Sequence, residues 1–246
     1  MRVSILGSGG GVPSAARETS CVLIREGSRA LLLDMGSGAR RLLANPGLLD
    51  GTTELHVVLT HFHFDHVCGL PFLPWFRVGA TIWAPGRWLY AQDSGDILGP
   101  LRRPPVAPDD VTDTYPINEL RPGDQMIAGF EVRTSAQPRH WAPTVGLRID
   151  DDLAFVTDTP YEASSSELAD GATHLLHEAW SSSRAPMYPD RDATAADAAR
   201  VAREAGVTDL TLVHLNPRIE DLALLLDDAR GTFERVALGE DELTLA

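Results

Sequence analysis

Four side chains of the kinds that bind metal ions lie within six consecutive residues, His61-Phe62-His63-Phe64-Asp65-His66. His61 and His63 are two residues apart, so an extended or turning backbone would point both imidazoles to one side. Asp65 and His66 follow where the chain is expected to turn into a helix. Ligand clusters of this density usually bind metal, which disfavours the alternative of a chance group of surface histidines. The motif therefore predicts a metal site.

The ligand types narrow down the metal and its chemistry. Imidazole nitrogens with a single carboxylate suit zinc, and also manganese or iron, better than calcium or magnesium. Two ligand groups on one short loop indicate two divalent ions, about 3.5–4 Å apart, that share a hydroxide. This hydroxide exists near neutral pH because the ions lower the pKa of the bridging water. We expect it to attack an electrophilic centre, so the chain is predicted to be a hydrolase.

Further ligands must come from elsewhere in the chain, because each ion needs three or four protein ligands. His140, Asp158 and His214 each lie at the end of a predicted strand or just beyond it, where loops gather at one edge of a sheet. A lone histidine is more often structural than a ligand. His140 and His214 are interpreted as ligands only because the motif needs more of them. Asp34, before a glycine-rich turn, is expected to fix that loop or a ligand histidine.

Short apolar runs predict ten strands, several of them without strict alternation, as in sheets that are covered on both faces. The predicted strands are Val3–Leu6, Ser20–Ile24, Ala30–Asp34, His56–Thr60, Thr81–Ala84, Phe130–Ser135, Thr144–Ile149, Ala154–Thr157, His174–Glu178 and Leu210–His214. Helical spacing predicts helices over Ala39–Leu43, Thr194–Ala205 and Glu220–Gly231. The second has a capping threonine at its start and Gly206 just past its end. This order predicts a layered α/β sandwich in one domain.

Residues 85–124 depart from this pattern. They contain seven of the 17 prolines and show little periodicity, so we expect an excursion over the surface. A lid over a site and a solvated connector are about equally consistent with such a segment.

The composition limits partners and compartment. The formal net charge is −14 at pH 7, and nucleic acid binding usually depends on a basic face, so a small-molecule substrate is favoured over a nucleic acid. No apolar run approaches the roughly 20 residues of a membrane helix, and no signal peptide is recognised, so no membrane partner is expected. Two cysteines, Cys21 and Cys68, are too few for a disulfide framework, which favours a reducing cytoplasm.

Six further segments accompany the metal motif: Gly7–Pro13, Leu33–Gly38, Val67–Pro71, Val156–Thr159, Leu176–Ala179 and His214–Arg218. Together with His-x-His-x-Asp-His after a Leu-Thr strand, they resemble the metallo-β-lactamase superfamily, and most closely its ribonuclease Z-like branch. The likeness covers nearly the whole chain. It implies a four-layer αββα sandwich that residues 1–246 form as a single hydrolase domain.

The resemblance also implies which residues hold each metal. One ion would be held by His61, His63 and His140. The other would be held by Asp65, His66 and His214, with Asp158 bridging the two.

The catalytic candidates are Asp65, Glu178 and Asp192. In the branch, the glutamate of a His-Glu-Ala segment pairs with a histidine that donates a proton. Glu178 matches that glutamate, but the sequence has Asp192 where the branch has the histidine. A carboxyl group in that place could donate a proton only if its pKa were raised, so the alternative is a leaving group that needs no acid.

Two departures argue against maturation of transfer RNA. In many bacterial members, a long arm that grips tRNA is inserted in the sequence between the third histidine and the bridging aspartate. Here only 17 residues, 141–157, separate His140 from Asp158. The second departure is Asp192, which stands where the branch has the proton-donating histidine.

We therefore expect a dinuclear phosphodiesterase for a small diester, such as a cyclic nucleotide or a cyclic sugar phosphate, because two metals can meet the charge that develops on phosphoryl oxygens. The alternative is a lactone or carboxylic ester hydrolase, and less favoured are a tRNA 3′-processing endonuclease and a non-catalytic metal-binding protein. Aromatic residues near the motif and in the proline-rich segment could stack a planar group, although core packing accounts for at least half of them. Members of the branch are often dimers, so a homodimer is expected by analogy alone.

Overall fold

The computed structural model describes residues 1–107 and 109–245, and the chain divides into two compact units. The first unit comprises Met1–Ser8, Val12–Arg121 and Glu240–Ala246, and the second comprises Gly9–Gly11 and Pro122–Gly239. Within the described ranges, every helix is too short or too polar to cross a lipid bilayer. The single-domain organisation of residues 1–246 stays a prediction.

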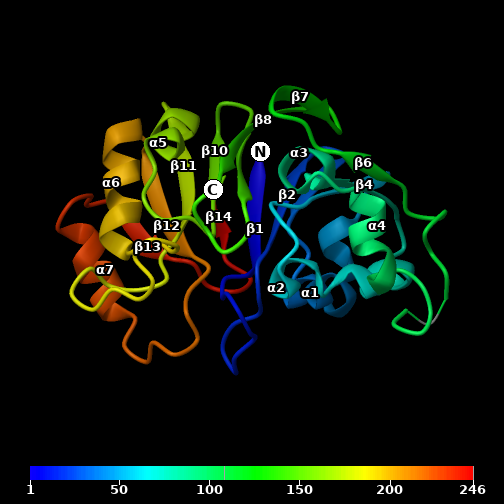
Figure 1. The fold of residues 1–246 in the computed structure, drawn as a ribbon, viewed down its shortest axis with the longest axis horizontal. Coiled ribbons are helices and arrows are strands. Elements are labelled where there is room, and N and C mark those ends of the chain that lie inside the picture. Colours follow the sequence, from blue (N-terminus) through cyan, green and yellow to red (C-terminus); the bar gives the residue numbers. More distant parts are fainter. Residues whose placement is uncertain (108, 246) are drawn as a thin grey trace. The chain divides into compact units, whose positions relative to one another are not determined.

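The first unit is built on a seven-stranded mixed sheet with the order β14-β1-β2-β3-β4-β5-β6 (Figure 1). The strands β3, β4, β5 and β6 are parallel to one another, whereas β1 and β2 run antiparallel to their neighbours. Parallel strands direct their carboxyl ends to one edge of the sheet, so the loops after β3 and β4 meet there. The bounds are β1 Arg2–Gly7, β2 Cys21–Glu26, β3 Arg29–Leu33, β4 Glu54–Val58, β5 Gly79–Ala84, β6 Ile117–Glu119 and β14 Thr244–Leu245.

Short helices cover this sheet and close its core. Leu32 of β3 and Val57 of β4 belong to one apolar cluster with Leu42 of α1, Leu70 of η3 and Leu98 of α4. The helices of this unit are η1 Ser37–Ala39, α1 Arg40–Ala44, η2 Pro46–Leu49, α2 Phe64–Val67, η3 Leu70–Trp75, α3 Gly86–Tyr90, α4 Ser94–Leu98 and η4 Gly99–Leu101.

The second unit has a sheet of the same size, with the order β13-β12-β11-β10-β9-β8-β7. Here β10 to β13 are parallel to one another and β7 to β10 are antiparallel, so the loops after β10, β11 and β12 meet at one edge. The bounds are β7 Gly123–Ile127, β8 Phe130–Gln137, β9 Thr144–Ile149, β10 Leu153–Val156, β11 His174–Glu178, β12 Asp209–Val213 and β13 Val236–Leu238.

Three helices pack on the second sheet: α5 Ala163–Ala169 against β8, β9 and β10, α6 Ala195–Ala205 against β11 and β12, and α7 Ala223–Arg230 against β13 (Figure 1). The buried face of α6 consists mainly of alanines, which let the helix approach Leu175 and Leu210 of the sheet closely. Thr194 caps its first turn in a reciprocal capping box with Asp197, and Gly206 ends it in the left-handed conformation. The predicted caps of this helix are confirmed.

All ten predicted strands are present, with ends shifted by no more than two residues. Four further strands, β6, β7, β13 and β14, were not predicted, and each lies at the edge of its sheet. An edge strand has only one neighbour, can be very short and needs no run of buried side chains. These strands therefore lack the apolar pattern that marks a central strand.

Residues 85–124, apart from residue 108, add more to the first unit than a solvated connector would. They form α3, α4, η4, β6 and the start of β7, and they bury Leu98, Val111 and Tyr115 in the core cluster. The Tyr115 hydroxyl donates a hydrogen bond to the carbonyl of Leu73 (3.1 Å). A lid role for this segment stays a prediction.

Asp241 ties the end of the chain to its beginning within the first unit. Its Oδ1 accepts hydrogen bonds from the backbone N–H and the hydroxyl of Ser8 (2.9 and 2.7 Å). Its Oδ2 accepts from the backbone N–H of Glu18 (2.7 Å) and from Nη2 of Arg41 (3.1 Å). The carboxylate is buried, so these four bonds replace its hydration.

We expect Asp241→Ala to lower the free energy of unfolding by about 2–4 kcal/mol, because hydrogen bonds to a charged group contribute about 1.5–3 kcal/mol each and are not additive. Urea unfolding of the full chain measures the change. Glu242→Ala is the matched control: the side chain of this exposed neighbour contacts Arg41, and we expect a loss below about 1 kcal/mol. Equal losses in both variants would contradict the role of Asp241.

Candidate metal centre

In the first unit, the metal motif begins directly after β4. His61 and His63 lie on the connecting turn, and Asp65 and His66 lie in α2, as the sequence predicted. The ring of His61 lies 4.5 Å from that of His63 and 4.2 Å from that of His66, between centroids. Asp65 Oδ2 lies 3.4 Å from Nε2 of His66. The unit therefore brings together its four predicted ligand side chains.

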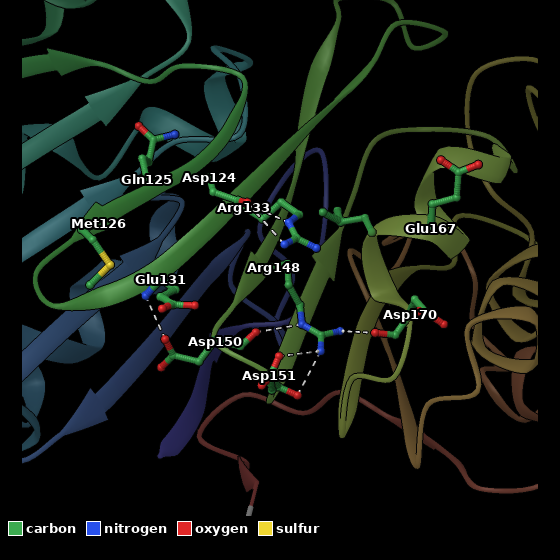
Figure 2. Close-up of a pocket in the computed structure, with 11 residues that line it drawn as sticks. Asp124, Gln125, Met126, Glu131, Arg133, Arg148, Asp150, Asp151, Glu167 and Asp170 are labelled. Atoms are coloured by element: carbon green, nitrogen blue, oxygen red, sulfur yellow. Dashed lines mark hydrogen bonds and ion pairs between the residues drawn. The ribbon is translucent and has the colours of Figure 1, made fainter.

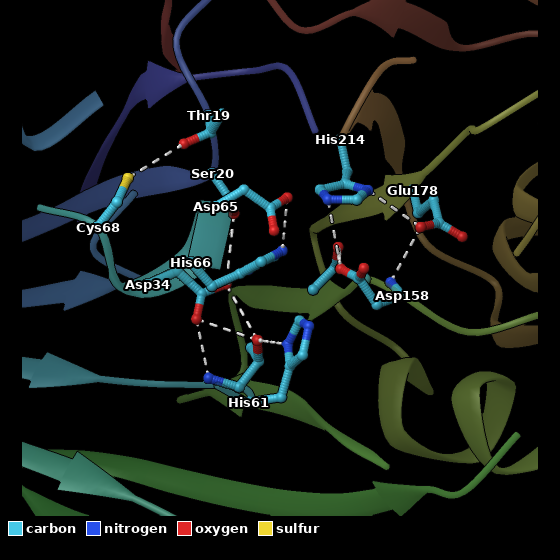
Figure 3. A network of polar contacts seen from close by, with 12 residues as sticks. Thr19, Ser20, Asp34, His61, Asp65, His66, Cys68, Asp158, Glu178 and His214 are labelled. Carbon is cyan, nitrogen blue, oxygen red and sulfur yellow. Dashed lines mark hydrogen bonds and ion pairs between the residues drawn. The ribbon is translucent and has the colours of Figure 1, made fainter. Parts of the chain in front are cut away.

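Asp34, directly after β3, lies among the side chains of this group (Figure 3). It accepts hydrogen bonds from the backbone N–H of Thr60 (2.8 Å) and from Nδ1 of His66 (2.7 Å), and Ser20 donates to the same carboxylate. The Thr60 hydroxyl donates to Asp34 and lies 3.0 Å from Nδ1 of His61. Asp34 thus contacts both the turn at Thr60 and the predicted ligand His66, and its role toward a metal-bound histidine stays a prediction.

In the second unit, three predicted ligands follow the ends of strands. His140 lies beyond β8, Asp158 follows β10 and His214 follows β12. Nε2 of His140 lies 3.4 Å from Asp158 Oδ1, and Nε2 of His214 lies 3.5 Å from Asp158 Oδ2. The Asp158 carboxylate therefore lies between two imidazole Nε2 atoms, an arrangement suited to a carboxylate that serves two metals.

Glu178, at the end of β11, is completely buried and contacts three groups of the second unit. Its Oε2 accepts from Nδ1 of His214 and from the backbone N–H of Asp158 (3.1 Å each), and its Oε1 accepts from the backbone N–H of Ala193 (2.7 Å). Figure 3 shows it beside His214 and Asp158. Burial, opposed by the hydrogen bond from His214, raises the pKa of Glu178 to about 7.

Asp192 orients the remaining imidazole. Its Oδ1 lies 3.0 Å from Nδ1 of His140, and the carbonyl of Arg191 accepts from the same nitrogen (3.1 Å). Burial disfavours the charged imidazole, but the hydrogen bond to Asp192 and the charges of Asp158 and Glu178 outweigh it, and the pKa of His140 is raised. Asp192 thus contacts a predicted ligand, and its role as a proton donor stays a prediction.

One arrangement recurs in both units: a buried carboxylate accepts from Nδ1 of a predicted ligand histidine and leaves Nε2 toward the neighbouring predicted ligand. The pairs are Asp34 with His66, Glu178 with His214 and Asp192 with His140. Such partners fix the tautomer and orientation of metal-binding imidazoles.

The buried charges also fit a cation. In the second unit Asp158, Glu178 and Asp192 are at most 4% exposed, and each of them contacts His140, His214 or both. One potential ligand atom from each of Asp158, Glu178 and His214 lies within 4.8 Å of the others. Clustered buried carboxylates are costly unless positive charge compensates them, and bound divalent ions would supply it.

The backbone around these side chains adopts unusual conformations. Asp34, Asp158 and His214 all have positive φ angles, of 56°, 54° and 49°. Non-glycine residues in this region are strained, and such strain concentrates at functional sites. Gly10 packs so closely on His214 that a Cβ there would lie 2.5 Å from Nε2. Glycine at position 10 thus leaves space around Nε2 of His214, the ring nitrogen that does not contact Glu178.

We expect Gly10→Ala to displace the His214 imidazole and to lower the metal content of the purified protein by about one ion per chain. Its backbone does not need glycine, because the φ angle of Gly10 is not positive. Gly79→Ala is the matched control, since a Cβ there meets nothing within 4 Å. Elemental analysis by mass spectrometry measures the metal. Unchanged metal content in Gly10→Ala would refute the role of this space.

We expect Asp34→Asn to weaken zinc binding about 10–100-fold, the usual effect of removing a carboxylate that orients a metal-binding histidine. Asparagine tolerates the positive φ of this position, so the backbone is retained. Competition with a chromogenic chelator measures the affinity, and Asp50→Asn, which changes an exposed aspartate of the same unit, is the control. Affinity within twofold of the unaltered protein would contradict the orienting role.

Three histidines lie outside these arrangements. His177 is buried in β11, donates through Nδ1 to the carbonyl of Glu178 (2.9 Å), and burial lowers its pKa to about 4. Nδ1 of His56 accepts from the Trp83 indole (3.1 Å). His174 begins β11.

The sequence analysis missed two residues that contact His214. They are Gly10, for which the close approach is a tertiary fact, and Trp180, whose ring stacks on the imidazole with centroids 5.5 Å apart. The glycine run Gly9–Gly11 was the only signal for the first, and no signal pointed to the second.

A hollow of about 410 Å³ lies elsewhere in the second unit, lined by residues of β7, β8, β9 and α5 (Figure 2). Its buried cation, Arg148, donates to the carbonyls of Asp150, Asp151, Ala169 and Asp170. These bonds connect the β9–β10 turn to the end of α5, so Arg148 is structural. The lining contains none of the predicted ligands.

Comparison with known proteins identifies the family. Residues 29–215 match the model described as the beta-lactamase superfamily domain. A ribonuclease Z of Haloarcula marismortui is 26% identical and aligns with 98% of this chain and 95% of its own length. The metallo-beta-lactamase fold protein YhfI of Bacillus subtilis matches 100% of this chain and 99% of its own, with a TM-score of 0.82 and 21% identity. A diphosphatase from the PhnP family matches 100% and 97%, with a TM-score of 0.75 and 16% identity. The predicted metallo-β-lactamase fold class and the ribonuclease Z-like resemblance are confirmed.

Proposed function

The chain belongs to the beta-lactamase superfamily and is a metal-dependent hydrolase, and we propose that it is a phosphodiesterase for a small diester. The proposal rests on buried carboxylates that accept hydrogen bonds from Nδ1 of predicted ligand histidines. Nε2 of each of these histidines lies beside Asp65 or Asp158. Imidazole Nε2 and carboxylate oxygens are the donor types of catalytic zinc sites.

We assign the ligands as the resemblance implies, with the donors of both units serving two ions. His61, His63 and His140 would hold one ion, Asp65, His66 and His214 would hold the other, and Asp158 would serve both. Zinc suits this donor set best, with manganese and iron as alternatives. When bound, the two ions make hydroxide available near neutral pH and offset the charge that develops on phosphoryl oxygens.

The residues of the chain itself position these groups. Asp34, Glu178 and Asp192 keep three imidazoles in one tautomer, and Thr60 fixes the turn that carries His61. Because Glu178 and Asp192 are already engaged with imidazoles, we assign them a positioning role. A substrate whose leaving group departs as a stable anion needs no proton donor from the protein.

The substrate class is a small diester for two reasons. The formal net charge of −14 disfavours a large polyanion, because nucleic acid binding depends on basic surface that neutralises phosphates. Residues 141–157, where many ribonuclease Z proteins carry an arm, form only the β9–β10 hairpin of the second sheet. A relative named ribonuclease Z and a structural neighbour named diphosphatase both cleave bonds at phosphorus, which favours a phosphorus centre over a lactone.

Three further proposals accompany this function. The small substrate is the main partner, the protein forms a homodimer by analogy with its relatives, and its compartment is the cytoplasm. The last rests on the reduced cysteines: Cys21 and Cys68 are both free, and burial raises the pKa of each thiol.

We expect the zinc-loaded protein to hydrolyse bis(p-nitrophenyl) phosphate, and Asp65→Ala and His66→Ala each to lower kcat by at least 100-fold. A panel of lactones, aryl esters and a precursor tRNA is assayed in parallel. The exposed aspartate variant Asp50→Asn is the matched control and should retain activity. Removal of metal by a chelator should abolish turnover, and added zinc should restore it.

Lactone or ester cleavage with an inert diester would replace the proposal by an ester hydrolase. Cleavage of precursor tRNA at a rate above that of every small diester would replace it by an RNA-processing enzyme. Diester hydrolysis that survives both substitutions would refute the assigned metal ligands.

A further inference from the structure

Two large aromatic side chains of the second unit are exposed side by side. Trp141 is 63% exposed and Tyr188 is 54% exposed, and their rings meet edge to face with centroids 5.9 Å apart. Single exposed aromatics are common on protein surfaces, but a contacting pair leaves a continuous apolar face open to solvent. Trp141 directly follows His140, a predicted metal ligand.

The guanidinium group of Arg191 packs on the Trp141 ring of this pair. The guanidinium carbon of Arg191 lies 5.1 Å from the centre of the Trp141 ring. Nη1 of Arg191 donates to the carbonyls of Arg139 and His140 (3.3 and 3.2 Å), and the carbonyl of Arg191 accepts from Nδ1 of His140. The indole, the guanidinium and the ligand imidazole are therefore linked by direct contacts.

Tyr188 is held in a conformation that its residue type disfavours. Its φ angle is +52°, which is uncommon for a bulky residue, and its carbonyl accepts from the backbone N–H groups of Arg191 (2.7 Å) and Asp192 (2.9 Å). The same turn places Asp192 against Nδ1 of His140. A strained turn that presents an exposed ring and orients a ligand histidine is of the kind that persists at functional sites.

We propose that Trp141 and Tyr188 form a stacking platform for a planar heterocycle, so that the preferred diester carries a nucleobase. The inference rests on the proposed function for its site, and it adds the substrate class. A base is recognised by its π-face, which an exposed tryptophan with a tyrosine at its edge provides without specific hydrogen bonds. Arg191 contributes a cationic edge that favours an anionic nucleotide. Such stacking changes affinity about 5–150-fold per base.

The test compares a nucleotide with its base-free counterpart on the metal-loaded full chain. Isothermal titration calorimetry measures the dissociation constants of adenosine 5′-monophosphate and ribose 5-phosphate. We expect the nucleotide to bind at least tenfold more tightly, and Trp141→Ala to remove this advantage while leaving ribose 5-phosphate within twofold. Trp141→Phe, which keeps a ring, should retain most of it. Trp75→Ala removes a similarly exposed indole (68%) from the first unit and should leave it unchanged.

The outcomes separate this inference from the proposed function. Equal affinities for both probes in the unaltered protein, or an advantage that survives Trp141→Ala, would overturn the platform even if bis(p-nitrophenyl) phosphate is cleaved. An equal loss in Trp75→Ala would also overturn it, because the effect would not belong to this pair. A base preference that requires Trp141 in a protein without diesterase activity would support the platform and refute the phosphodiesterase.

Discussion

The hydrogen bond between a buried carboxylate and Nδ1 of an imidazole is the interaction on which the candidate metal centre depends. It occurs in both units, with Asp34 on His66, Glu178 on His214 and Asp192 on His140. Each bond fixes one tautomer and leaves Nε2 for a metal. A carboxylate buried in this way is costly by itself, so the arrangement is stable only with compensating hydrogen bonds and positive charge. The fold supplies the bonds, through Thr60 N–H to Asp34 and Ala193 N–H to Glu178, and a metal would supply the charge.

Within each unit, these side chains can meet because the sheet has a parallel half. Asp34 and the metal motif follow β3 and β4, and Asp158, Glu178 and His214 follow or end β10, β11 and β12. Carboxyl ends of neighbouring parallel strands lie at one edge, so residues far apart in the chain converge there without any local sequence relation. The strands β3, β10, β11 and β12 behind these edges are buried on both faces over most of their length. Rigid supports of this kind hold ligand geometry more precisely than free loops do.

The residues around the predicted ligands show a second constraint, which is the limited space for side chains and backbone beside them. Gly10 lies against His214 where no side chain would fit, and three of the residues at the strand ends adopt positive φ angles. The turn at Tyr188 belongs to the same pattern, because it orients Asp192 while it exposes an aromatic ring. Strain and exposure both oppose stability, and their concentration around the predicted ligands is typical of a part of a fold that is shaped for binding rather than for packing.

The sequence alone determined the local features of this protein. The density of ligand side chains in residues 61–66 indicated a metal site, the apolar runs located all ten central strands, and Thr194 and Gly206 marked the ends of α6. These signals are local, because ligand type, burial on two faces and helix capping each leave a pattern within a few residues. Only the tertiary structure decided the rest. The edge strands needed a neighbour rather than an apolar run, and Gly10 mattered only because His214 packs against it. Asp192 was a catalytic candidate in the sequence, and its role as a proton donor stays a prediction. Its 3.0 Å distance to Nδ1 of His140 joins residues 52 positions apart, which no local pattern encodes.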